Sequence, residues 1–93
     1  MNRIEASSIA QREVDSYRAK SYVDLKRLIK EIDAYEVASL SGQSYQIEVH
    51  ASWDNKPNDN IRVFCEVSSG FWSSVFPLCV SFIMSPEGKY VGE

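Results

Sequence analysis

The chain is 93 residues long, with 44% hydrophobic and 25% charged residues, which is typical of a globular protein and excludes disordered and collagen-like classes. Its net charge is −3, and the acidic excess falls after residue 36, where the clustered Lys and Arg of a nucleic-acid-binding surface are missing. Because the sequence has neither a signal-peptide core nor a run of about 18 apolar residues, we expect one acidic, cytoplasmic domain over residues 1–93, without a membrane partner.

Apolar residues recur at helical period over the first third of the chain. A first stripe, weakened by its alanines, consists of Ala6, Ile9, Ala10, Val14 and Tyr17. A stronger stripe follows Ser21, which has the form of a helix N-cap with Asp24 three residues later, and consists of Leu25, Leu28, Ile29, Ile32 and Tyr35. We expect residues 5–36 to be helical and the second stripe to pack on a sheet. The sequence leaves open whether Ser21 divides this segment into two helices.

After Gly42, which suits a turn, the period of the sequence changes to two. Three runs of alternating residues predict strands over 45–53, 61–68 and 76–84, joined by a polar turn at 54–60 and a short connection at 69–74. The turn Ser85–Gly88 predicts that residues 89–91 return as a short fourth strand. The expected fold class is therefore α+β, with an N-terminal helix packed on one face of a four-stranded antiparallel meander.

Strand alternation assigns one set of side chains to the core and the opposite set to what we call the second face of the sheet. The core row consists of Tyr45, Ile47, Val49, Ala51, Trp53, Ile61, Val63, Cys65, Val67, Leu78, Val80 and Phe82. In the simplest register of the first hairpin, Trp53 lies opposite Ile61 and Glu48 opposite Glu66. A slip of two residues would instead pair His50 with Glu66.

These alternatives suggest one catalytic arrangement on the second face. His50 would carry a proton, Glu48 or Glu66 would be its partner carboxylate, and Arg62 would hold an anion. However, alternation alone predicts polar residues on a solvated face, and a flat face lacks the concavity of an active site. The sequence therefore leaves enzyme activity undecided, with the balance against it, and we expect no cofactor.

The second face is not uniformly polar, because strict alternation also places an apolar strip on it: Phe64, Val75, Cys79 and Ile83. We expect this strip to be covered by the N-terminal helical segment, by a second copy of the chain or by another protein. A bulge at Pro77 would change the parity and remove the strip. Phe71 and Trp72, in the connection before it, would either plug the end of the core or anchor a partner.

The two cysteines are predicted to face opposite sides of the sheet, Cys65 inward and Cys79 outward, so we expect both to be reduced. Residues 54–60 contain oxygen ligands but lack the order of a calcium-binding loop, and turn chemistry explains them. A lone histidine and two cysteines do not make a zinc site. We therefore expect no metal.

Three functions remain compatible with the sequence. The leading hypothesis is a non-enzymatic protein-interaction or homodimerisation module that uses the second face. An alternative is a small-ligand binder or minor enzyme with a cavity between helix and sheet near His50, lined by Tyr22, Tyr35 or Tyr45. Another is an acidic inhibitor or immunity-type partner of a basic protein, contacting it through Glu48, Asp54, Asp59 and Glu66.

Overall fold

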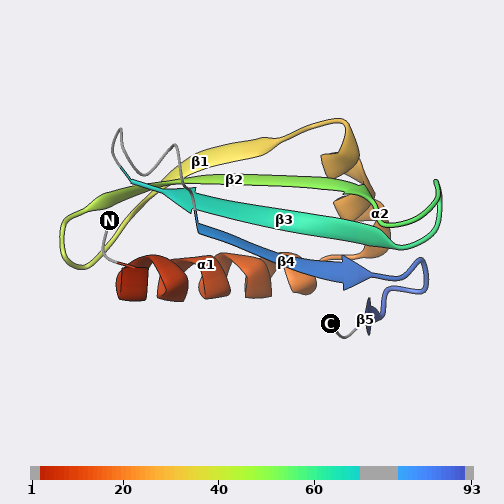
Figure 1. The fold of residues 1–93 in the computed structure, drawn as a ribbon, viewed down its shortest axis with the longest axis horizontal. Helices are drawn as coiled ribbons and strands as arrows, with labels where there is room; N and C mark the ends of the chain where they lie inside the picture. Colours follow the sequence, from red (N-terminus) through yellow and green to blue (C-terminus); the bar gives the residue numbers. More distant parts are fainter. Residues whose placement is uncertain (1–2, 70–77, 92–93) are drawn as a thin grey trace.

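The computed structural model describes residues 3–69 and 78–91, and it is an α+β fold, as predicted. Its elements in chain order are α1 (Arg3–Arg18), α2 (Tyr22–Lys26), the short 3-10 helix η1 (Arg27–Ile29), β1 (Asp33–Ala38), β2 (Ser44–Trp53), β3 (Ile61–Ser68), β4 (Leu78–Met84) and β5 (Tyr90–Val91). The described strands form one five-stranded antiparallel sheet in the order β1-β2-β3-β4-β5 (Figure 1). The predicted meander therefore has one strand more than expected.

The additional strand is β1, which the sequence analysis had assigned to a helix. The N-cap at Ser21 is confirmed, because its side chain accepts a hydrogen bond of 3.2 Å from the backbone N–H of Asp24, and it separates two helices. The second helix, however, ends after η1 at Ile29. Ile32, expected in the core, is 62% exposed, and Tyr35 lies in β1 opposite Ile47. A short apolar run fits the period of a helix as well as that of a strand. Here pairing with β2 supplies hydrogen-bond partners for the backbone N–H and C=O groups.

The second helix packs on the sheet, as predicted, but most of the helical cover comes from α1. α1 lies along β3 and β4 (Figure 1), and its weak apolar stripe is buried throughout: Ala6, Ile9, Ala10, Val14 and Tyr17. Two alanines with no exposed surface let the helix approach the strands closely. The second stripe contributes Leu25 and Leu28 to the same core, so both helices pack on one side of the sheet.

Of the two β2–β3 registers that the sequence left open, the structure has the simpler one. Trp53 lies opposite Ile61, and burial alternates along both strands. The polar turn at 54–60 closes with a hydrogen bond of 2.9 Å from the backbone N–H of Asp54 to the carbonyl of Asn60. β4 continues the core row, with Val80 opposite Cys65 and Phe82 opposite Val63.

Glycines in left-handed conformations form the two short turns. Gly42 has φ of +87° between β1 and β2, and Gly88 has φ of +81° between β4 and β5. An L-residue at either position would be strained. The predicted turn Ser85–Gly88 thus returns the chain as β5, which pairs with the end of β4. Within the described residues, no helix is long and apolar enough to cross a bilayer.

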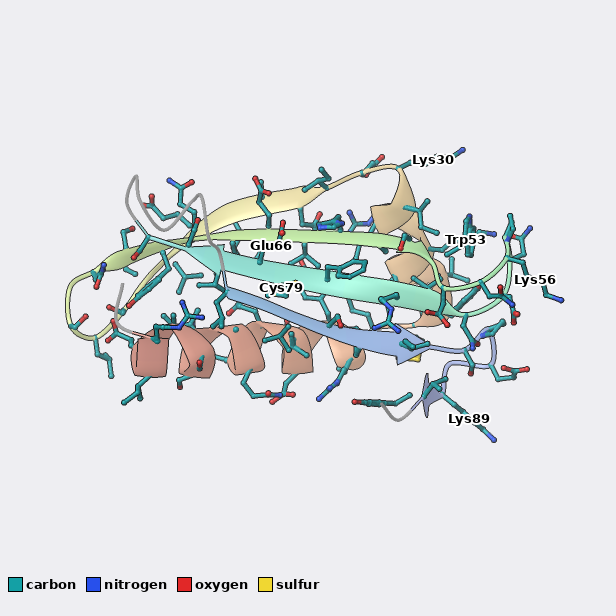
Figure 2. The ribbon with its side chains drawn as sticks, viewed as in Figure 1. Lys30, Trp53, Lys56, Glu66, Cys79 and Lys89 are labelled. Carbon is teal, nitrogen blue, oxygen red and sulfur yellow. The ribbon has the colours of Figure 1, made fainter. Side chains whose placement is uncertain are left out.

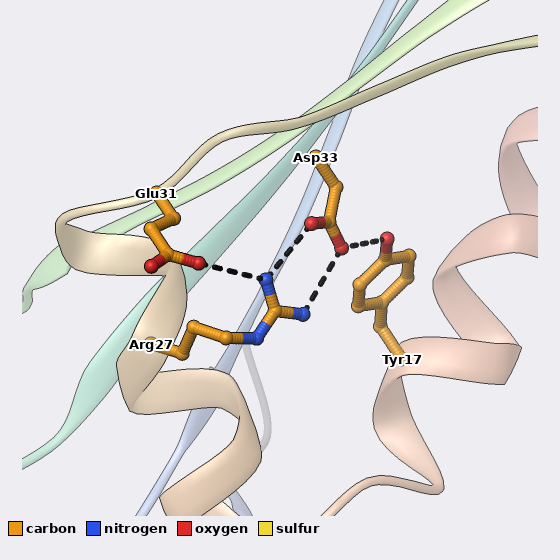
Figure 3. A network of polar contacts seen from close by, with 4 residues as sticks. All are labelled: Tyr17, Arg27, Glu31 and Asp33. Carbon is orange, nitrogen blue, oxygen red and sulfur yellow. Dashed lines mark hydrogen bonds and ion pairs between the residues drawn. The ribbon is translucent and has the colours of Figure 1, made fainter.

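A polar network ties α1, η1 and β1 together (Figure 3). Arg27 donates two hydrogen bonds to the Asp33 carboxylate, at 2.9 and 3.2 Å, and the Tyr17 hydroxyl donates a third at 2.6 Å. Glu31 lies 3.8 Å from the same guanidinium. The hydrogen bonds from Arg27 and then Tyr17 lower the pKa of Asp33, while burial raises the pKa of Tyr17 to about 12. This network fixes the start of β1 against the helices.

We predict that Asp33→Asn lowers the free energy of unfolding at pH 7 by about 1–2 kcal/mol, because it removes a charged acceptor from the network. Since the folded pKa of Asp33 lies below its unfolded value, this contribution is complete above about pH 4 and disappears as the pH falls through the folded pKa. Urea unfolding of both proteins across this range measures it. Glu31→Gln, on a side chain that is 69% exposed, is the control and should change stability by less than about 0.5 kcal/mol. Equal losses for both variants would contradict the prediction.

Candidate functional site on the second face

The second face of the sheet carries the suggested catalytic residues and the described part of the apolar strip. Because the core row faces α1 and α2, the residues between its members face the opposite way. On β2, β3 and β4 these are Gln46, Glu48, His50, Ser52, Arg62, Phe64, Glu66, Ser68, Cys79, Ser81 and Ile83. None of the described helices packs on this side.

His50 lies at the centre of this face and contacts two side chains of β3. Its ring stacks on Phe64, with centroids 5.1 Å apart and an interplanar angle of 18°. Its Nε2 atom lies 3.5 Å from Oε2 of Glu66, and the two side chains are 35% and 32% exposed. His50 is opposite Phe64, so it reaches Glu66 diagonally. The unslipped register therefore still brings His50 to Glu66.

His50 lies next to two carboxylates that face each other across strands β2 and β3. Glu48 lies directly opposite Glu66, as the simplest register predicted. Facing carboxylates repel each other. The His50 ring, stacked on Phe64, lies beside one of these carboxylates, that of Glu66. Glu48, His50 and Glu66 therefore form one polar cluster on this face.

Arg62 is held at the other end of the face. Its Nε atom lies 3.3 Å from Oδ1 of Asp54, and its Nη1 donates to Oγ of Ser81 at 3.4 Å. Asp54, expected to contact a basic partner, is thus engaged within the chain. Arg62 and the His50–Glu66 pair occupy the same face of the sheet.

His50, Glu66 and Arg62 of the suggested catalytic arrangement lie outside the three surface grooves that described residues form. A histidine–glutamate pair can move a proton, but a reaction also needs a concave site that excludes water. Three surface grooves of about 360, 410 and 280 Å³ are formed by described residues, and none is lined by His50, Arg62, Phe64 or Glu66. His50 also points away from the space between helix and sheet, so it does not line a cavity there. Among the described residues, no group of three metal-ligating side chains is found.

Three members of the expected apolar strip are described, and all three lie on the second face. Phe64 is half-buried, Cys79 is exposed, and Ile83 is only 7% exposed. α1 does not cover them, since it packs on the opposite face. Val75, Phe71 and Trp72 lie outside the described residues.

The two thiols face opposite sides, as predicted, and are chemically different. Cys65 is buried in the core, and burial raises its pKa to about 12. Cys79 is exposed, and its pKa is also raised, first by desolvation and then by the charge of Glu66, which lies opposite it on β3. Neither thiol has the lowered pKa of a nucleophilic cysteine.

The sequence analysis missed a second polar cluster, between α1 and β1. The Tyr35 hydroxyl donates a hydrogen bond of 2.6 Å to Glu13, beside the Tyr17–Asp33 contact. It was missed because Tyr35 had been assigned to a helical stripe. The alternation of Tyr35 and Val37 with polar neighbours was the available signal for a strand.

Comparisons with known proteins return no relative: no family model matches the chain, and no curated protein or solved structure is significantly similar to it.

We predict that alkylation of the native protein, at low protein concentration, modifies Cys79 well before Cys65. Glu66→Gln should accelerate the reaction of Cys79 about twofold near pH 8, because it removes a negative charge that raises the thiol pKa. Iodoacetamide labelling followed by mass spectrometry measures both rates. Glu48→Gln removes the facing carboxylate, which does not contribute to this pKa, and should leave the rate unchanged. Modification of Cys65 first, or equal effects of the two variants, would refute the assignment.

Proposed function

We propose that the protein is a non-enzymatic interaction module that dimerises through the second face of its sheet. The observation that carries this proposal is the placement of all described helices on one side of the sheet, which leaves Phe64 and Cys79 on the side without a helical cover. Sheets with one uncovered apolar face commonly bury it against a second sheet, at a spacing of about 10 Å.

The charge pattern of β3 supports a second copy as the occupant of this face. Arg62, Phe64 and Glu66 follow one another at a spacing of two on the second face. A two-fold axis through Phe64 and perpendicular to the strand would place Arg62 against Glu66 of the partner subunit, and Phe64 against its own counterpart. Such self-complementarity is what an isologous interface requires.

The size of the chain also supports association. A domain of 93 residues buries only about two-thirds of its unfolded surface, so its margin of stability is narrow. A partner that binds only the folded chain stabilises the fold, and the gain increases with the concentration of the partner relative to the dissociation constant. A dimer would thus stabilise the fold and cover the apolar part of the second face.

We predict that light scattering after size exclusion gives twice the chain mass of 10.6 kDa for the wild type. Phe64→Glu should give a monomer, because it places two charges at the centre of the interface. Leu40→Glu is the matched control, since Leu40 is fully exposed in the β1–β2 turn and should leave the dimer intact. Circular dichroism confirms that each variant folds. A monomeric wild type, or a dimeric Phe64→Glu variant, would overturn the proposal.

The proposed two-fold arrangement makes a separate prediction about charge. Arg62→Glu and Glu66→Arg should each weaken the dimer by about tenfold, because each places like charges across the interface. The double variant restores opposite charges between subunits and should recover most of the affinity. Analytical ultracentrifugation measures the dissociation constants. Additive losses in the double variant would exclude this arrangement while leaving the dimer itself unaffected.

A further inference from the structure

A groove of about 360 Å³ lies at the end of β2, where α2 and η1 meet the sheet, on the helix side and away from the second face. Figure 2 shows Trp53 and Lys30 at this end of the molecule. The groove has apolar walls from Val23, Ile29 and Trp53, cationic groups from Lys26, Arg27 and Lys30, and one carboxylate, Glu31, which pairs with Arg27 at 3.8 Å. The charged groups that line it thus carry a net positive charge.

The apolar part of the groove is built into the core. Ile29 and Trp53 are partly buried and pack against the core cluster, so their positions are fixed. Val23, in contrast, is 74% exposed, so its side chain is accessible from solvent. The Lys26 ammonium lies 5.8 Å from the centroid of the Trp53 ring. A planar group entering here would therefore meet an aromatic ring and a cation together.

The cations around the groove differ in whether they form ion pairs with carboxylates. Arg27 is held by Asp33 at 2.9 Å and by Glu31 at 3.8 Å. Lys26 and Lys30, in contrast, form no ion pair with any carboxylate of residues 3–69 and 78–91. Two uncompensated ammonium groups beside an apolar wall stand out in a chain whose net charge is −3.

We propose that this groove binds a small planar organic anion, of the aromatic carboxylate or sulfonate class. The ring of the ligand packs against Trp53, Val23 and Ile29, and its anionic group lies between the ammonium groups of Lys26 and Lys30. The volume is near the lower end of the range for ligand sites, which suits one or two fused rings. This site shares no residue with the dimer interface proposed above, and it does not depend on it.

The test uses naphthoate as the probe, with the neutral naphthamide as its uncharged counterpart. The chain has two tryptophans, and the Trp72→Phe variant leaves Trp53 as the only one. We expect naphthoate to quench its fluorescence with a saturable, sub-millimolar curve, and to bind at least about tenfold more tightly than naphthamide. Absence of a Trp53 response at millimolar naphthoate, or equal affinity for both probes, would overturn the proposal.

Charge variants then locate the anionic group. The double variant Lys26→Gln, Lys30→Gln should weaken naphthoate binding about tenfold or more and leave naphthamide binding unchanged. The double variant Lys20→Gln, Lys89→Gln removes the same number of charges elsewhere and should bind as the wild type does. The site would be refuted if both double variants weakened naphthoate binding equally. It would also be refuted if the Trp53 fluorescence responded to an acidic peptide and not to naphthoate. Light scattering on the same variants measures whether the oligomeric state has changed, so a loss of naphthoate binding can be told apart from a loss of the dimer.

Discussion

The structure depends on one packing constraint: alternate apolar side chains of β2, β3 and β4 are buried beneath α1. The side chains between them must then face the opposite side of the sheet. A slip of one residue would turn a whole row to the wrong face, so the register is strongly specified. The same constraint sends His50, Phe64 and Glu66 to the second face. The candidate interface is thus a direct consequence of the core, and its residues need no separate mechanism to be brought together.

The helices leave two distinct surfaces of the sheet without a complete cover. α1 covers β3 and β4, while α2 and η1 form a short cap at the end of β2, where Trp53 stays partly accessible. One surface is the flat second face, centred on Phe64. The other is the groove beside Trp53, on the opposite side of the sheet. The network of Arg27, Asp33 and Tyr17 holds the cap in place and so connects the fold to the groove.

Long alternating segments were the most predictable part of the structure. Counting residues was enough to predict the opposite orientations of Cys65 and Cys79 and the turn at Gly88, and it reduced the β2–β3 register to two alternatives. β1 could not be predicted in this way, because Ile32 and Tyr35 also continue a helical stripe. The local pattern fits a helix and a strand, and the pairing of β1 with β2 decided in favour of the strand.

The sequence by itself determined which face of β2 and β3 is buried, since a period of two over eight or more residues admits only one solution for a strand. Tertiary structure alone decided three other matters. It selected α1 as the cover, because Ala6 and Ala10 allow close packing that their low hydrophobicity did not suggest. It made β1 a strand, and it brought His50 to Glu66 across a diagonal, because those contacts depend on distances between segments that no local pattern encodes.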